Sequence, residues 1–222
     1  MISAEERIKK LARAQSLDAG DAERLLDAVR PGARTGERRR RLSVLSNPFD
    51  RWSGETTSLI GALLALAGLA TSRLGVRYDG ALDLHVSPVA VPLGVAVLDQ
   101  LLAVGLTSLV MWGVARLVSR ARFVDVLGAV GVSRAPAVLV AVPLALLVPL
   151  IPHDYTKTNL PVVLAIALLG LAGVVAQVWL LVLGFRTATG ARGGRLASAL
   201  IGGLFAAELL VKIVLAVVHV PR

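Results

Sequence analysis

The 222-residue sequence contains no cysteine, which excludes disulfide bonds and gives no indication of a redox compartment. Charge is scarce over most of its length, because nine of the 15 acidic residues and twelve of the 24 Lys and Arg residues lie before Thr56. The remainder is mostly Leu, Val, Ala and Gly, the whole chain is 55% hydrophobic, and the mean hydropathy is +0.73. A globule of ordinary size cannot hide so much apolar surface, so the sequence predicts an integral membrane protein that contacts the lipid bilayer.

The sequence also lacks recognisable catalytic patterns. It has no Ser-His-Asp nucleophile elbow, no phosphate-cradling loop and no HExxH helix, so we expect no enzyme, no catalytic residues and no cofactor. The three histidines, with Asp83 and Asp154 nearby, could form a metal site, but their spacings match no ligand motif and we expect ordinary loop histidines and no metal: His85, His153 and His219.

The formal net charge of +9 does not indicate nucleic-acid binding. Most basic residues stand at the ends of apolar runs, where they set membrane orientation and meet anionic headgroups. Positions of this kind are expected for Arg38, Arg39, Arg40, Arg41, Arg120 and Arg122, and specific lipid or protein recruitment is the alternative for the four-arginine run.

Hydropathy predicts an all-α fold, a polytopic membrane bundle of about five transmembrane helices. The amphipathic stretch at about 121–133 is expected to be an interfacial helix on the membrane surface, and the alternative is that it extends the third span. The predicted domain covers 56–222, with spans at about 56–72, 93–118, 136–152, 160–185 and 196–218.

Basic residues orient these spans. Nineteen Lys and Arg fall on the side of the N-terminus and four on the other side, which places the N-terminus in the cytoplasm and the C-terminus outside. The preference for Arg over Lys is typical of a GC-rich bacterial genome, so the expected location is a bacterial inner membrane.

Before the spans, residues 1–30 read as a helical hairpin and 31–55 as a basic linker. The segment "AEERIKKLARAQSLDAGDAERLLDAV" resembles the short SHOCT-like two-helix modules that open some bacterial envelope proteins. That resemblance implies a small interaction module without chemistry, and hence a possible protein partner at the hairpin.

Three further stretches carry a second resemblance. "NPFDRW" leads into the first span, "RARFVDVLGAVGVSRAP" lies between the second and third, and "QVWLLVLGFRTATGARGGRLASAL" joins the fourth to the fifth. In this order they resemble the Yip family, the Ypt/Rab-interacting membrane proteins, in a bacterial form. The resemblance implies a five-helix bundle with a cytoplasmic N-terminal region, and it transfers no functional residues.

Four polar residues interrupt the apolar runs: Asp99, Gln177, Glu208 and Lys212. Ionisable groups inside a membrane are costly, so they normally face the bundle interior and find partners. Glu208 and Lys212 share one helix face, and Asp99 is expected at a matching depth. We therefore expect a buried cluster of Asp99, Glu208 and Lys212, which is either a structural strut or a proton or ion relay, with Gln177 as an interhelical hydrogen-bond donor.

Small residues on the last two spans, Gly170, Gly173, Gly202 and Gly203 among them, indicate either close packing of these spans or a homo-oligomer face. The function expected from the whole sequence is a non-catalytic module that organises the membrane or recruits partners. The alternative is a small transporter or channel that uses the polar cluster.

Overall fold

The computed structural model describes residues 47–87, 89–147 and 160–218. The chain divides into two compact units, Met1–Pro48 and Phe49–Arg222. Three sets of residues singled out from the sequence lie outside the described residues: the predicted hairpin at 1–30, the arginine run Arg38–Arg41, and the histidines His153 and His219.

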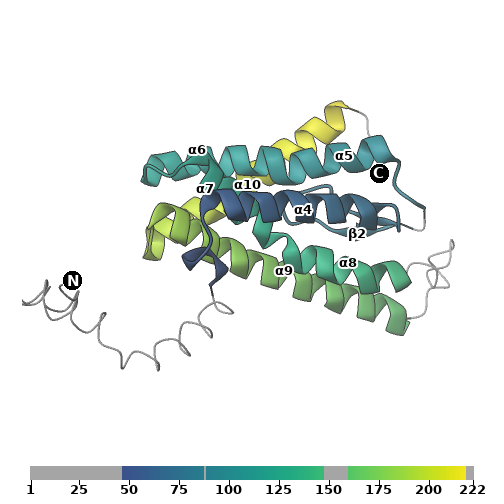
Figure 1. Ribbon diagram of the computed structural model, residues 1–222. Helices are drawn as coiled ribbons and strands as arrows, with labels where there is room; N and C mark the ends of the chain where they lie inside the picture. The colour runs from purple at the N-terminus through teal and green to yellow at the C-terminus, as the bar shows by residue number, and fades with distance from the viewer. Residues whose placement is uncertain (1–46, 88, 148–159, 219–222) are drawn as a thin grey trace, which may run out of the picture. The chain divides into compact units, whose positions relative to one another are not determined.

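The second unit is a bundle of helices, as the sequence predicted (Figure 1). Five helical stretches within the described residues have the length and apolar composition needed to cross a membrane. They are α4 (Gly54–Ser72), the continuous run α5 (Leu93–Gln100), η2 (Leu101–Leu106) and α6 (Thr107–Val118), the pair α7 (Phe123–Ser133) and α8 (Ala135–Leu147), α9 (Leu160–Thr189) and α10 (Gly193–Val217). The short elements are η1 (Pro48–Asp50), β1 (Val76–Arg77) and β2 (His85–Val86).

Local chemistry fixes both ends of α4. The Ser53 side chain accepts a hydrogen bond from the Thr56 amide at 3.2 Å, which caps the first turn. After the helix, Gly75 has a φ of 86°, a conformation that glycine adopts without steric cost, and the chain turns there into β1. These two residues explain why the first span is short and why the following loop reverses at once.

The second span changes helical type in its middle. Residues 101–106 form a π-helix, and the Thr107 hydroxyl donates to the Leu102 carbonyl at 3.3 Å. Short π segments inside α-helices are frequent at functional sites. This one directly follows the buried Asp99 and Gln100.

Glycines allow α4 and α7 to approach closely. A methyl group built on Gly131 would lie 2.6 Å from the Gly61 Cα atom, and one on Gly128 would collide with the Thr57 side chain. The Ser58 hydroxyl also donates to the Val124 carbonyl at 2.8 Å. Helices in lipid associate through this kind of small-residue contact.

This contact corrects the expectation of an interfacial helix at 121–133. Helix α7 is buried along much of its length, packs against α4 and α9, and continues into α8 with only Arg134 between them. Phe123–Leu147 is thus one apolar stretch, which was the alternative weighed from the sequence. The apolar side of α7 faces other helices instead of headgroups because its glycines fit against α4.

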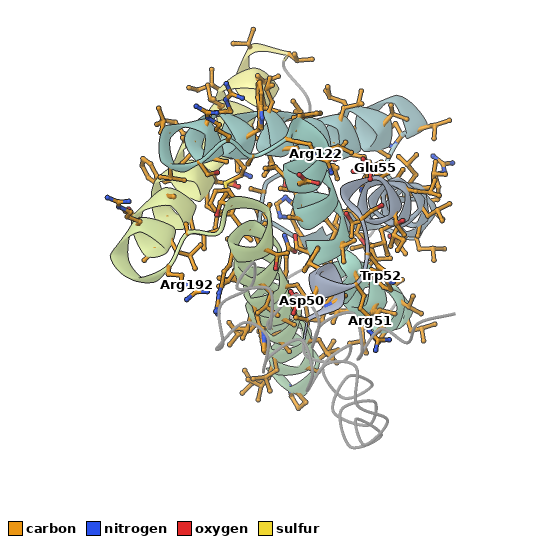
Figure 2. All side chains as sticks on the ribbon, turned by 60° about the vertical axis from the view of Figure 1, so that its left-hand side comes forward. Asp50, Arg51, Trp52, Glu55, Arg122 and Arg192 are labelled. Atoms are coloured by element: carbon orange, nitrogen blue, oxygen red, sulfur yellow. The ribbon has the colours of Figure 1, made fainter. Side chains whose placement is uncertain are left out.

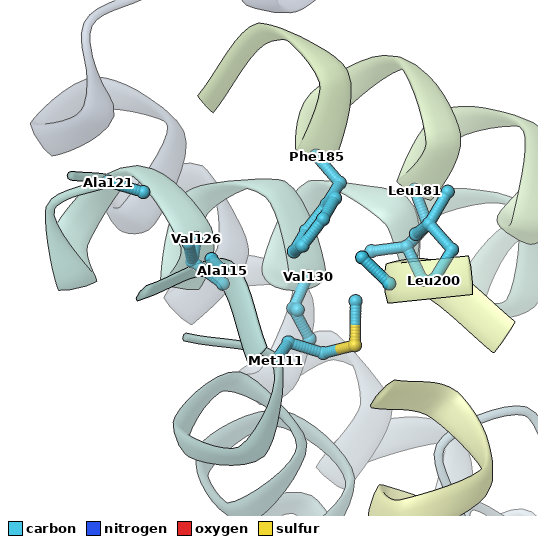
Figure 3. Packing of buried hydrophobic residues seen from close by; sticks show 9 residues of the cluster. Met111, Ala115, Ala121, Val126, Val130, Leu181, Phe185 and Leu200 are labelled. Carbon is cyan, nitrogen blue, oxygen red and sulfur yellow. The ribbon is translucent and has the colours of Figure 1, made fainter. Parts of the chain in front are cut away.

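The largest hydrophobic cluster joins α6, α7, α9 and α10 (Figure 3). Met111, Val130 and Phe185 are almost completely buried in it, beside Leu181 and Leu200. Large apolar side chains outside the clusters are exposed, as expected for surfaces that contact lipid tails: Leu59, Leu63 and Leu66 on α4, and Leu164, Leu168 and Leu171 on α9.

The glycines of the last two spans do not join α9 to α10. Gly173 faces Val140 of α8, and Gly203 faces Met111 of α6. Gly170 and Gly202 have no atom within 4 Å of a built Cβ. Close packing of these two spans through their glycines, one of the two alternatives weighed from the sequence, is therefore wrong, because α10 packs chiefly against α6 and α9 against α7 and α8.

Candidate functional site

The loop between α4 and α5 folds back into the bundle. Its strands β1 and β2 pair antiparallel, with Val76 opposite Val86 and Arg77 opposite His85. Tyr78, Asp79 and Ala81 are 1%, 2% and 3% exposed, although no helix contains them. Non-helical backbone is tolerated beside hydrocarbon only where protein or water satisfies its polar groups, so this loop needs partners.

Polar side chains from the apolar helices supply those partners. Arg134, between α7 and α8, donates from Nη1 to the carbonyls of Gly80 at 3.1 Å and Ala81 at 2.7 Å. Gln177 of α9 donates from Nε2 to the Ala81 carbonyl at 2.7 Å. Glu208 of α10 accepts from the Ala81 amide at 2.8 Å. Three spans therefore hold one two-residue stretch of loop backbone.

Two further contacts fix the beginning of the loop. The Tyr78 hydroxyl lies 2.9 Å from the Thr71 hydroxyl of α4, and the Arg134 guanidinium lies over the Tyr78 ring. Burial raises the pKa of Tyr78 above its ordinary value, against smaller opposing effects of Thr71 and Arg134. The phenol thus stays neutral, as a buried hydrogen-bonding group should.

Asp99 forms an ion pair with a loop residue. Arg77 donates from Nε to Asp99 Oδ2 at 2.9 Å, and the two side chains are 8% and 0% exposed. The sequence predicted that Asp99 would lie beside Lys212, whereas in the structure the Asp99 carboxylate pairs with Arg77. The second span is thereby tied to β1.

Lys212 is surrounded by other acids. Its Nζ lies 2.7 Å from Asp83 Oδ2, 3.5 Å from Glu208 Oε1 and 3.6 Å from Asp79 Oδ2, and it donates to the Asp79 carbonyl at 3.3 Å. Glu208 and Lys212 are adjacent at the i, i+4 spacing noted in the sequence. Two of the three acids around Lys212 come from the loop.

His85 completes this cluster. Its Nε2 lies 2.9 Å from Asp79 Oδ2, and its Nδ1 lies 3.3 Å from Asp83 Oδ1. Hydrogen bonds to Asp79 and then Asp83 raise the pKa of His85 to about 9, against the opposing effect of burial.

The two loop carboxyl groups shift in the opposite direction. The hydrogen bond from His85 lowers the pKa of Asp83 well below its ordinary range, and Lys212 adds to this effect. Burial alone would raise the pKa of Asp79, but the contact with His85 and the charge of Lys212 outweigh it, so its pKa is also lowered. Both carboxylates are therefore ionised at neutral pH.

A second polar group lies where α4 and α7 begin (Figure 2). Arg122 makes two hydrogen bonds with Asp125, at 3.0 and 2.8 Å, and one with Glu55 at 3.3 Å. The group borders a pocket of about 280 Å³ that Phe49 and Trp52 also line. Arg120 is exposed in the preceding turn. The side chain of Arg122 is thus an exposed ion-pair partner at a helix end.

Sequence reasoning missed Arg77, Asp79, Asp83 and Arg134 as members of the buried network. It counted Arg77 and Arg134 only as loop charges that orient the spans. A usable signal did exist for Arg134, which lies in the middle of the apolar stretch Phe123–Leu147. An arginine at that depth requires interior acceptors.

Comparison with known proteins gives one match. The family model described as the Yip1 domain matches residues 42–216, which is most of the chain and close to the extent of the sequence resemblance. No curated protein and no solved structure matches the chain.

Proposed function

Since the chain belongs to the Yip1 domain family of multi-pass membrane proteins, we propose that it is a non-catalytic module that anchors a partner-recruiting N-terminal segment at a bacterial inner membrane. In this proposal the five-helix bundle is the anchor. The N-terminal segment, with its arginine run, supplies the cytoplasmic contacts with protein or lipid headgroups.

The observation that carries the proposal is that the polar side chains inside the bundle bind the loop between α4 and α5. Arg134, Gln177 and Glu208 bind the loop backbone at Gly80 and Ala81, and Asp99 binds Arg77. These contacts tie four spans to one loop. A network that binds the chain to itself suits a rigid anchor, because the contacts of these four side chains hold the loop against the spans.

Charge at one end of the bundle supports a cytoplasmic N-terminus. Arg122 precedes α7, Arg192 precedes α10, and Arg51 and Trp52 precede α4, so these residues share the end of the bundle at which α4, α7 and α10 begin (Figure 2). Trp52 is 40% exposed, as expected of an aromatic anchor at the headgroup level. Basic residues mark the cytoplasmic side of bacterial membrane proteins.

The test is a crosslinked pull-down from membranes with the full chain and with a variant that lacks residues 1–41. Two controls accompany it: size-exclusion chromatography in detergent, which verifies that the truncated bundle stays intact, and a full-length variant with Arg38–Arg41 replaced by Gln. We expect a partner that crosslinks to the full chain and disappears with the truncation.

The controls separate the two kinds of recruitment. Loss of the partner on truncation but not on arginine replacement assigns recruitment to residues 1–37, whereas loss in both assigns it to the basic run. Capture of the same proteins by the intact truncated bundle would contradict the proposal.

A further inference from the structure

Three residues of the loop between α4 and α5 bring together two carboxylates and an imidazole, which are side chains of the kinds that coordinate metals. Asp79, Asp83 and His85 each place one donor atom so that the three atoms lie within 4.8 Å of one another. Two donors bound to one Zn²⁺ ion at about 2.1 Å in a tetrahedron are roughly 3.4 Å apart, so small side-chain movements would bring the three into range. One imidazole and two carboxylates form a donor set that suits Zn²⁺ and its neighbours among the transition metals.

A buried oxygen atom of the same cluster lacks a partner. Asp79 is 2% exposed, its Oδ2 contacts His85 and Lys212, and its Oδ1 has no hydrogen-bond donor. A desolvated carboxylate oxygen without a donor is costly, and a metal ion would satisfy it. The unpartnered oxygen is a second observation, separate from the grouping of the three side chains, and it points to a cation at the Asp79 carboxylate.

The scaffold around these donors is held firmly. The pairing of Arg77 with His85 in the two strands fixes the backbone that carries the imidazole. Hydrogen bonds from Arg134 and to Glu208 fix the backbone at Gly80 and Ala81, next to Asp79. His85 and Asp83 have side chains that are 45% and 38% exposed, which leaves the donors a route to solvent.

Lys212 shows that this position attracts positive charge. Its ammonium lies 2.7 Å from Asp83 Oδ2 and 3.5 Å from Glu208 Oε1, where it balances part of the charge of three carboxylates. The lysine reaches the cluster along a flexible side chain that is 32% exposed. It is therefore a displaceable competitor for the carboxylates that a metal ion would use.

We propose that Asp79, Asp83 and His85 bind one divalent transition-metal ion of the Zn²⁺ type, and that, when the ion enters, His85 releases its proton to solvent and Lys212 withdraws from Asp83. Glu208 or water completes the coordination. When Glu208 is the fourth ligand, the bound ion links the loop to α10 through coordination bonds, in place of the partly exposed ion pair of Lys212 with Asp83.

The experiment uses the full chain in detergent, purified with a tag that contains no histidine and stripped with EDTA. Zn²⁺ binding is measured by competition with a chromogenic chelator, and Mg²⁺ serves as the comparison ion. We expect one Zn²⁺ per chain and no competition from Mg²⁺. His85→Ala and Asp83→Asn should each weaken binding by at least about tenfold, because loss of a direct ligand costs no less than loss of an outer-shell group.

Two further variants make the result specific. Asp125→Asn, which removes a carboxylate from the Arg122 group instead, should leave the affinity for Zn²⁺ unchanged. Lys212→Met should tighten binding by about tenfold or more, since it removes the competing charge. A weaker affinity in Lys212→Met, or equal losses in Asp125→Asn and Asp83→Asn, would overturn the proposal.

A readout on the unmodified chain avoids dependence on the folding of variants. Co²⁺ added to the stripped protein should give visible absorption bands of a nitrogen- and oxygen-ligated ion, and Zn²⁺ should abolish them at one equivalent. Absence of these bands together with absence of Zn²⁺ binding would refute the site. That result would leave the recruitment proposal untouched, because recruitment depends on residues 1–41.

Discussion

The guanidinium of Arg77 donates to the carboxylate of Asp99 over 2.9 Å, and both side chains are buried. One residue belongs to a two-residue strand of the inserted loop and the other to α5, so the pair ties the loop to the second span.

This pair makes a direct prediction about stability. Arg77→Met should lower the free energy of unfolding by about 3–5 kcal/mol, because it leaves an uncompensated carboxylate in the interior. The double variant Arg77→Met, Asp99→Leu should recover most of that loss, since it removes both charges. Thermal unfolding in detergent measures both. Equal melting temperatures for the single variant and the native chain would show that the pair contributes nothing.

The close contact of α4 and α7 gives a matched pair of substitutions. Gly131→Ala should lower the melting temperature, because its Cβ would lie 2.6 Å from the Gly61 Cα atom and the helices would have to separate. Gly113→Ala in α6 meets no atom within 4 Å and should be neutral or stabilising by up to about 1 kcal/mol, through helix propensity. The reverse order of the two variants would contradict the packing described for α7.

The absence of cysteine allows a clean test of the loop contacts. In an Ala81→Cys chain the single thiol is buried and should react slowly with a maleimide. Adding Arg134→Met removes the charged donor from two carbonyls, a loss of about 1.5–3 kcal/mol for a hydrogen bond to a charged group, so labelling should accelerate by about tenfold or more. Adding Arg192→Met, at the opposite end of the bundle, is the control and should not change the rate.

The protonation of His85 predicts a pH dependence in metal-free protein. Its pKa in the folded chain is about 9, above the value of about 6.5 in an unfolded chain, so the proton stabilises the fold. This contribution is fully present below about pH 6.5 and is lost as the pH rises through about 9. With EDTA present, the difference in melting temperature between the native chain and His85→Gln should therefore shrink between pH 6 and pH 10. A constant difference would show that the two aspartates do not keep His85 protonated in the folded chain.

The family and the all-α five-span bundle were predictable from the sequence, and both are confirmed. An apolar run of about 20 residues has the length of a helix that crosses a bilayer, so composition and length alone predict a membrane span. The contact between Glu208 and Lys212 was also predictable, because residues at the i, i+4 spacing are neighbours on one face of a helix. These predictions depended only on local periodicity and composition.

What the sequence did not reveal was the course of the loop between α4 and α5. Asp79 and Asp83 look like ordinary loop acids, and nothing local to them indicates that they meet Lys212, more than 120 residues away. Arg77 was assigned to the membrane surface for the same reason. The position of α7 was misjudged because an apolar stripe fits a lipid surface as well as a neighbouring helix, and only the Gly61–Gly131 contact decides between them.

A cytoplasmic N-terminus is the premise of the recruiting module, and the orientation of the two termini can be measured. Single-cysteine chains Ser3→Cys and Val220→Cys are labelled in intact bacterial cells with a membrane-impermeant maleimide, before and after permeabilisation. With the N-terminus in the cytoplasm and the C-terminus outside, Cys at position 220 should react in intact cells and Cys at position 3 only after permeabilisation. Labelling of position 3 in intact cells would contradict this orientation.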